Sequence, residues 1–346
     1  MGTPGKILVI KPSSLGDVVH VFPALEVLRR SFPDSELDFV IHPAFAGLLD
    51  LSPFPVRRKI LFDRKKLSSP KSFLPECVKL LKELRKENYE LVVDFQGLFR
   101  SGILAWCARS CITAGFAAPR EGVAKIFYNR KFAVLMEQHA VARYVELANC
   151  ICGTRYPVPE CSVKRETPSF PGVTSPYVVL VPGARWESKV FPPELFGETF
   201  NEIKKHLPQC KAVVAGAASD APAAAKIKAI AGEGCIDLTG KTSLLELARL
   251  TGGASAVLTN DSGPMHVAAM TGTKIYALFG STSPFLTGPW GKEHKIVSVP
   301  DLPCAGCMKR VCPAPEKHLC HRIDPGELGR EIASYIKTQS TCEVQK

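Results

Sequence analysis

Short and nearly continuous apolar segments recur along the chain, and most are followed by a turn and a helical pattern. The clearest are residues 6–10 (KILVI), 37–41 (LDFVI), 91–95 (LVVDF), 177–181 (YVVLV), 211–216, 256–258 and 275–279. Strands that are apolar at successive positions are buried on both faces, which is typical of parallel sheets covered by helices. The alternation predicts an α/β fold with doubly wound parallel sheets.

The alternating pattern is interrupted between residues 153 and 176, a polar stretch with five prolines. With 346 residues, 46% of them hydrophobic, the chain can build two ordinary cores. We therefore expect a Rossmann-like domain at residues 1–160, a linker at 161–176, a second Rossmann-like domain at 177–325, and a C-terminal helix and tail at 326–346.

The net charge of +11 is concentrated in the first half. Residues 1–165 hold 25 Lys and Arg against 16 Asp and Glu, whereas residues 166–346 hold 19 against 17. This imbalance predicts an anionic partner for the first half, such as a nucleic acid, a lipid headgroup or a phosphorylated sugar. Basic clusters at 57–59, 64–66, 120 and 129–131 indicate either solvated loops or an anion-binding face. No apolar run approaches the roughly 20 residues of a membrane span, and we expect a cytoplasmic protein.

The turn at residues 260–266 (NDSGPMH) follows one buried strand and precedes a helix. Ser262, Gly263 and Pro264 suit a sharp strand-to-helix turn, which directs backbone N–H groups and the positive end of a helix dipole toward one point. The turn predicts a diphosphate site, with Asp261 accepting hydrogen bonds from sugar hydroxyls. The alternative is an ordinary turn in which Asp261 is the N-cap of the helix.

The loop at residues 11–20 (KPSSLGDVVH) has the same strand–loop–helix layout. It lacks the Gly-x-Gly-x-x-Gly pattern, so a dinucleotide site of the dehydrogenase kind is not supported. In the second half, the strands that end at Val181, Leu258 and Phe279 all continue into Gly/Ser/Pro loops, which can share one crevice.

Four of the 13 cysteines cluster near the C-terminus, at Cys304, Cys307, Cys312 and Cys320, with His318 and His321 close by. The cluster is a candidate structural zinc site. Its spacing is irregular compared with common zinc modules, which favours a reduced or disulfide-bonded surface segment.

Six stretches together resemble the lipopolysaccharide heptosyltransferases, glycosyltransferase family 9. They are residues 11–20, 95–98 (FQGL), 127–131 (FYNRK), 138–141 (QHAV), 260–266 and 279–282 (FGST), in order over roughly residues 6–285. The resemblance implies a GT-B fold, in which two Rossmann-like domains face a central cleft. It also implies inverting transfer of L-glycero-D-manno-heptose from ADP-heptose to the inner core of lipopolysaccharide, onto Kdo or the first heptose.

The resemblance assigns roles to individual residues. Asp17 matches the catalytic base, for which the alternative is a helix N-cap, and Lys189 matches a lysine that contacts the diphosphate. No Asp-x-Asp pair occurs, so neither a divalent cation nor another cofactor is expected. The expected donor-binding residues are Ser14, Gly16, Lys189, Asp261, Ser262, Gly263, Met265 and His266. The expected acceptor-binding residues are Arg57, Arg58, Gln96, Arg120, Arg130 and His139.

Some alternatives stay open. Residues 182–184 (PGA) are more similar to the enzymes that add the second heptose, whereas 127–131 and 138–141 are more similar to those that add the first. His20 is expected to be a packed helix residue, and His266 either that or a ligand contact. There are two rival functions: glycosyl transfer from a UDP- or GDP-sugar, and nucleic-acid binding. The absence of basic stretches interleaved with aromatic residues counts against nucleic-acid binding. The expected partners are ADP-heptose, the lipid A–Kdo core and the inner-membrane surface, with no nucleic acid.

Overall fold

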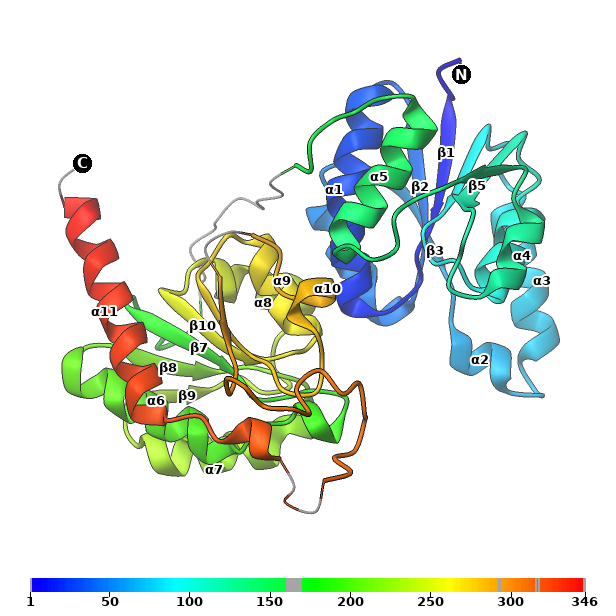
Figure 1. Cartoon of the computed structure of the whole chain (residues 1–346). Coiled ribbons are helices and arrows are strands. Elements are labelled where there is room, and N and C mark those ends of the chain that lie inside the picture. The colour runs from blue at the N-terminus through cyan, green and yellow to red at the C-terminus, as the bar shows by residue number, and fades with distance from the viewer. Residues whose placement is uncertain (1, 160–169, 292–293, 315, 317, 345–346) are drawn as a thin grey trace. The chain divides into compact units, whose positions relative to one another are not determined.

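The computed structural model describes residues 2–159, 170–291, 294–314, 316 and 318–344. The chain divides into two compact units, Met1–Cys161 (unit 1) and Ser162–Lys346 (unit 2), each built on a parallel six-stranded sheet (Figure 1). Most of the predicted linker, residues 161–169, lies outside the described part of the chain.

Unit 1 has the strand order β3-β2-β1-β4-β5-β6. Helices α1 and α5 pack together on one face of the sheet, and α3 and α4 cover the other (Figure 1). The strands are β1 (Lys6–Ile10), β2 (Glu36–Ile41), β3 (Val56–Leu61), β4 (Leu91–Asp94), β5 (Ile112–Phe116) and β6 (Arg130–Phe132). The helices are α1 (Leu15–Ser31), α2 (Arg64–Ser68), α3 (Phe73–Leu84), α4 (Phe99–Cys107) and α5 (Ala140–Cys152), with 3-10 turns η1 (Pro43–Leu51) and η2 (Gly122–Phe127).

Unit 2 has the strand order β12-β11-β10-β7-β8-β9. Helices α6, α7 and α11 cover one face, and α8 and α9 pack together on the other (Figure 1). The strands are β7 (Tyr177–Val181), β8 (Lys211–Val214), β9 (Cys235–Asp237), β10 (Ala256–Asn260), β11 (Ile275–Leu278) and β12 (Lys295–Val297). The helices are α6 (Pro193–His206), α7 (Ala221–Ala231), α8 (Leu244–Gly252), α9 (Gly263–Met270), α10 (Pro284–Thr287) and α11 (Pro325–Val344), with 3-10 turns η3 (Glu187–Lys189), η4 (Ala218–Asp220) and η5 (Leu319–His321).

The two sheets share one topology. Numbered from the first strand of each unit, both have the order 3-2-1-4-5-6, in which the direction of winding reverses between strands 1 and 4. The central strands β1, β4, β7 and β10 are almost wholly buried because helices cover both faces. The prediction of two Rossmann-like doubly wound domains is confirmed. Each unit therefore has a switch point, between β1 and β4 in unit 1 and between β7 and β10 in unit 2.

Some local predictions were wrong. The basic clusters at 57–59 and 130–131 lie on β3 and β6 rather than in loops. Both are edge strands, where charged side chains are tolerated because one side of the strand is unpaired. The C-terminal helix was expected to be short, but α11 has 20 residues. Within the described residues, no helix is both long and apolar enough to cross a lipid bilayer.

Candidate functional site

The switch point of unit 1 brings together two loops that carry predicted site residues. The loop after β1 passes through Ser13 into α1, and the loop after β4 begins near Gln96. The backbone N–H of Ser13 donates a hydrogen bond to Oε1 of Gln96 at 3.2 Å, so the buried amide joins the two loops. This edge of the sheet is where open α/β folds bind their ligands.

Asp17 lies in the first turn of α1, with its side chain 35% exposed. Its Oδ2 accepts hydrogen bonds from the backbone N–H of Ser14 at 3.0 Å and from the Ser14 hydroxyl at 2.7 Å. Ser14 is therefore the N-cap, and Asp17 is its partner at the third helical position rather than the cap itself. Gly16 is buried in the same turn. The arrangement leaves the other carboxylate oxygen, Oδ1, for different contacts.

Those contacts come from Lys11 and Tyr144. The buried Lys11 Nζ lies 3.9 Å from Oδ1 of Asp17 and donates to the Tyr144 hydroxyl at 2.7 Å, which in turn donates to Oδ1 at 3.5 Å. Burial alone would raise the pKa of Asp17, but Lys11 and the hydrogen bonds from Ser14 outweigh it and hold the pKa well below its usual value. Burial would lower the pKa of Lys11, but Tyr144 and Asp17 outweigh it and the pKa is raised. Both groups are therefore charged at neutral pH.

Two histidines lie near this carboxylate. His139 is the N-cap of α5, and its Nδ1 accepts the backbone N–H of Val141 at 3.2 Å. The His20 ring, buried on α1, packs edge-to-face against His139 with 5.4 Å between the ring centroids. His20 is a packed helix residue, as expected. His139 lies next to the switch point, where it was predicted to meet the acceptor.

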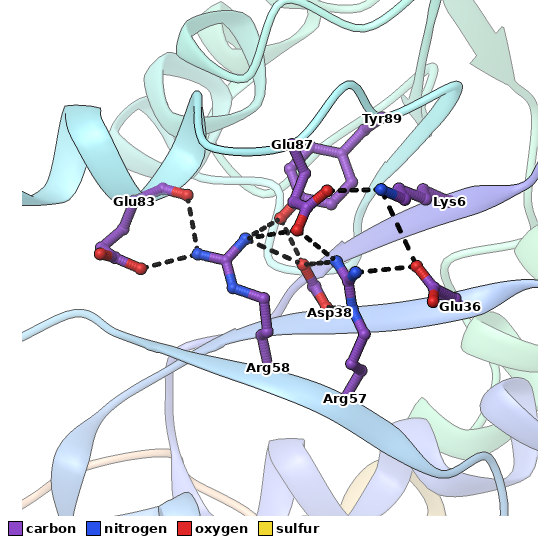
Figure 2. Close-up of polar contacts among 8 residues, drawn as sticks. All are labelled: Lys6, Glu36, Asp38, Arg57, Arg58, Glu83, Glu87 and Tyr89. Carbon is purple, nitrogen blue, oxygen red and sulfur yellow. Dashed lines mark hydrogen bonds and ion pairs between the residues drawn. The ribbon is translucent and has the colours of Figure 1, made fainter.

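Arg57 and Arg58 lie at the opposite edge of the sheet, where β1, β2 and β3 begin (Figure 2). Arg57 makes a two-pronged contact with the buried Asp38, through Nε at 3.0 Å and Nη2 at 2.9 Å. Arg58 contacts the same carboxylate at 3.3 Å and Glu83 at 2.6 Å. Lys6, Glu36, Glu87 and Tyr89 complete this network. The charges of both arginines are thus neutralised far from the switch point.

Arg120 and Arg130 are both exposed. Arg120 follows β5, and it lies within electrostatic range of Arg100, at the start of α4. Burial lowers the pKa of Arg100, the like charges of Arg64 and Arg120 lower it further, and the opposite charge of Glu121 raises it in part. Arg64, Arg100 and Arg120 therefore form a cationic cluster near the carboxyl ends of β3, β4 and β5. The predicted acceptor set contained only Arg120 of these three; Arg64 belonged to the basic cluster at 64–66, and Arg100 was not singled out.

The switch point of unit 2 joins its two loops in a similar way. The Nδ2 of Asn260, at the end of β10, donates to the backbone carbonyl of Pro182, after β7, at 2.6 Å. Lys189 Nζ lies 2.6 Å from Oδ2 of Asp261, which also accepts the Thr282 hydroxyl at 2.5 Å. The structure thus brings together Lys189 and Asp261, which are 72 positions apart. Thr282 belongs to a predicted stretch but was not singled out as a site residue.

The start of α9 lies in the same place. The N-cap is Ser262, so the alternative in which Asp261 caps this helix is wrong. The buried Ser262 Oγ has no hydrogen-bond partner among the described residues. Gly263 begins the helix, while the side chains of Met265 and His266 are buried within unit 2. Contact with a ligand from these positions would come from the backbone of the first turn.

The four clustered cysteines are free thiols. Burial raises the pKa of the Cys320 thiol, and the neighbouring Cys304, Cys312 and Cys307 raise it further, so the four lie within electrostatic range of one another. Over the described ranges, no group of three or more His, Cys, Asp or Glu side chains is arranged to hold a metal ion.

Comparison with known proteins connects both switch points to one family. The model of glycosyltransferase family 9 (heptosyltransferase) matches residues 77–318. Lipopolysaccharide heptosyltransferase 1 of Pseudomonas aeruginosa is 29% identical to this chain, over 97% of the chain and 93% of that protein. Lipopolysaccharide heptosyltransferase 1 of Escherichia coli K12 is 27% identical, over 85% and 94%.

Solved structures agree with this assignment. The E. coli heptosyltransferase WaaC with ADP-2-deoxy-2-fluoro heptose has a TM-score of 0.74 and 26% identity, covering 85% of this chain and 93% of that one. The E. coli ADP-heptose lps heptosyltransferase II has a TM-score of 0.77 over 97% of this chain and 99% of that one, but at 23% identity it supports the fold alone. The chain is a glycosyltransferase and belongs to glycosyltransferase family 9, the heptosyltransferase family.

Proposed function

We propose that the protein transfers L-glycero-D-manno-heptose from ADP-heptose to the inner core of lipopolysaccharide, onto Kdo or the first heptose, with inversion at the anomeric carbon. The observation that carries the proposal is the ionised Asp17 carboxylate at the switch point of unit 1. One of its oxygens is held by Ser14, and the other is supported by Lys11 and Tyr144. The relatives named lipopolysaccharide heptosyltransferase supply the donor and the acceptor class.

In the proposed reaction, Asp17 acts as general base. An acceptor hydroxyl oxygen attacks the anomeric carbon of the heptose, the bond from that carbon to the β-phosphate oxygen breaks, and the hydroxyl proton passes to Oδ1. A lowered pKa makes Asp17 a weak base, so the proton would transfer late, after bonding to the anomeric carbon has made the hydroxyl acidic. An aspartate with this pKa is ionised at neutral pH, as an ordinary aspartate also is.

The leaving diphosphate would be stabilised by unit 2. Lys189 Nζ carries three N–H donors, and only one is needed for the contact with Asp261. The other two N–H groups of Lys189 would stabilise the negative charge that develops on ADP. The Ser262 hydroxyl and the N-terminal turn of α9 would do the same. Together with the absence of an Asp-x-Asp pair from the sequence, this favours transfer without a divalent cation.

The domain roles follow from the same contacts: unit 2 would bind the donor and unit 1 the acceptor. Within unit 1, the cationic cluster of Arg64, Arg100 and Arg120 is well suited to the phosphates and carboxylates of an inner core. Arg130, which is also exposed, stays in the proposed acceptor set. We leave Arg57 and Arg58 out of it, because their charges are taken up by Asp38 and its neighbouring carboxylates.

The protein would meet a lipid acceptor at a membrane surface, and we place the contact on α2 and α3. Phe73, Leu74 and Val78 on α3 have 51%, 68% and 44% of their surface exposed. Exposed lysines surround them at positions 65, 66, 71 and 79. Exposed apolar side chains among cations are typical of peripheral binding to anionic lipid at the cytoplasmic face.

The direct test measures ADP release from ADP-heptose with Kdo-bearing lipid A, with and without a first heptose, as acceptor. We expect transfer to one of the two, an inverted anomeric configuration in the product by NMR, and full activity in EDTA. Thermal unfolding with ADP, UDP and GDP separates the rival donors, because only a ligand that binds the folded protein stabilises it. A larger shift with UDP or GDP than with ADP would overturn the donor assignment.

A further inference from the structure

The cysteine-rich segment, comprising residues 302–314, 316 and 318–321, lies between β12 and α11 outside the sheet of unit 2. Its backbone is nonetheless hydrogen-bonded to two loops at the carboxyl edge of that sheet, the loop after β11 and the loop after β7. In the bonds to the loop after β11, Gly306 N–H donates to the Gly280 carbonyl at 2.9 Å and Met308 N–H to the Ser281 carbonyl at 2.7 Å. The 3-10 turn η3, which ends at Lys189, is attached to the same segment.

Ser188 makes that attachment. Its N–H donates to the Arg310 carbonyl at 3.1 Å, and its hydroxyl donates to the Lys309 carbonyl at 2.6 Å. The same hydroxyl is hydrogen-bonded to the Ser281 hydroxyl at 2.9 Å, and the whole residue is 3% exposed. Ser188 therefore ties η3 to the segment and to the loop after β11.

His321 completes the attachment from the far end of the segment. Its Nε2 lies 3.2 Å from the Ser188 carbonyl, to which it donates because a carbonyl oxygen only accepts. The ring stacks on Phe191 with 4.1 Å between centroids, and burial lowers its pKa, so the imidazole is neutral at pH 7. In this way the polar backbone and side-chain groups of Ser188 are all engaged.

The residues next to this attachment form the predicted donor site. Lys189 follows Ser188 and Thr282 follows Ser281, and both contact Asp261. A lysine has a long, flexible stem, and η3 is only three residues long, so the turn alone cannot hold the ammonium group in place. The contacts of Ser188 with the cysteine-rich segment supply the missing constraint.

We infer that the cysteine-rich segment belongs to the donor site, and that Ser188 and His321 are positioning residues that hold Lys189 against Asp261 for the diphosphate of a nucleotide-sugar. The inference rests on the proposed function for one point, the identity of the ligand that Lys189 binds. Cys320 packs against that loop: a Cβ added to Gly280 would lie 2.6 Å from Sγ of Cys320, so the segment is in close contact with the loop that it holds.

The test compares Ser188→Ala, His321→Leu and His321→Gln, the last of which keeps an N–H donor near the position of Nε2. One readout is the rate at which an acetylating N-hydroxysuccinimide ester modifies Lys189, measured by mass spectrometry. The other is the Kd for ADP. Loss of the two hydroxyl hydrogen bonds in Ser188→Ala, and of the one imidazole hydrogen bond in His321→Leu, should change each readout by about 3- to 10-fold. His321→Gln should stay within about twofold of wild type, a rescue that depends on the hydrogen bond.

Thr199→Val is the matched control, because it removes a buried hydroxyl of unit 2 that has no hydrogen-bond partner among the described residues. It should leave both readouts unchanged. Thermal unfolding verifies that each variant is folded, and Ser188→Ala carries the test if His321→Leu is not.

The two readouts separate failure of the inference from failure of the proposed function. If Lys189 is acetylated at the wild-type rate in folded Ser188→Ala, and also in His321→Leu where that variant folds, and ADP binding is unchanged in Ser188→Ala, the positioning role is overturned. If acetylation rises in Ser188→Ala while the wild-type protein has no affinity for ADP, the positioning role stands and the donor assignment fails.

Discussion

The two units have the same strand order but opposite chemistry at their switch points. In each, a side-chain amide joins the first and fourth βα loops: Gln96 in unit 1 and Asn260 in unit 2. In unit 1 the buried partner is the cation Lys11, and the more accessible group is the carboxylate of Asp17. In unit 2 the buried partner is the carboxylate of Asp261, 5% exposed, and the more accessible group is Lys189, 17% exposed. One topology thus presents a partly exposed carboxylate in one unit and a partly exposed cation in the other.

This difference teaches that the strand order fixes where a site lies and the residues on its loops fix what the site does. A partly exposed carboxylate can accept a proton from a neutral hydroxyl. A partly exposed ammonium group can stabilise a departing phosphate.

The largest effect is expected for Asp17→Asn. An amide cannot accept the acceptor proton, so turnover should fall by about 10²- to 10⁴-fold, the usual contribution of a positioned base. Steady-state kinetics at saturating donor and acceptor measures it. Turnover within about tenfold of wild type would show that Asp17 only supports the start of α1.

The next effect is expected for Lys189→Met, which keeps the apolar stem and removes the charge. Loss of one charge-assisted contact to the diphosphate should raise the donor KM by about 10- to 100-fold and leave the acceptor KM unchanged. Lys226→Met, an exposed cation of the same unit with one long contact to Glu194, is the matched control. An effect of Lys189→Met on the acceptor KM alone would reverse the assignment of the two units.

The arginines of unit 1 should separate into two groups. Arg120→Ala and Arg130→Ala should each raise the acceptor KM by about 3- to 10-fold, with a steep dependence on salt, because exposed charges are screened. Arg57→Ala should leave the acceptor KM unchanged and lower the free energy of unfolding by about 1–3 kcal/mol, since it removes a two-pronged partner of the buried Asp38.

Lys59→Ala is the control for the second group, because the ion pair of Lys59 with Asp50 is exposed, and its loss should change the unfolding free energy by less than about 0.5 kcal/mol. A raised acceptor KM in Arg57→Ala with unchanged stability would return Arg57 to the acceptor surface.

The smallest expected effect is on how the free energy of unfolding depends on pH. The pKa of Asp17 is lower in the folded protein than its ordinary value of 3.8, so the carboxylate stabilises the fold above about pH 4 and the contribution is lost as pH falls through the folded pKa. The pKa of Lys11 is raised above 10.5, so its contribution is present below that pH and lost as pH rises through the folded value. The unfolding free-energy difference between wild type and Asp17→Asn should therefore be constant from pH 5 to 9 and shrink toward pH 3. A difference that already shrinks between pH 7 and 5 would contradict the lowered pKa.

The positions of the two switch points could be predicted from the sequence, since each combines a buried apolar strand, a small-residue loop and a helix start. Asp17, Lys189 and Asp261 lie in or beside such loops. Their partners could not be predicted in the same way. Tyr144 lies 133 positions from Lys11, and nothing in the local pattern of α5 shows that its hydroxyl reaches the first loop.

The basic clusters also show that the sequence alone does not predict the partners of a side chain. Arg57 and Arg58 stand out in the sequence, but pairing of β3 with β2 places them beside Asp38, and this neutralises them. Arg64, Arg100 and Arg120 come from three elements that only the sheet brings into range of one another. Charge along the chain predicted that unit 1 is basic, but it did not show which cations are available to a ligand.

Calorimetric titration of ADP into the full-length Asp17→Asn and Lys189→Met variants tests the contrast between the units most directly. The account predicts an ADP Kd within about twofold of wild type for Asp17→Asn, because the base contacts the acceptor, and a Kd at least about tenfold higher for Lys189→Met, because this lysine contacts the diphosphate. Weaker ADP binding in Asp17→Asn together with unchanged binding in Lys189→Met would contradict it.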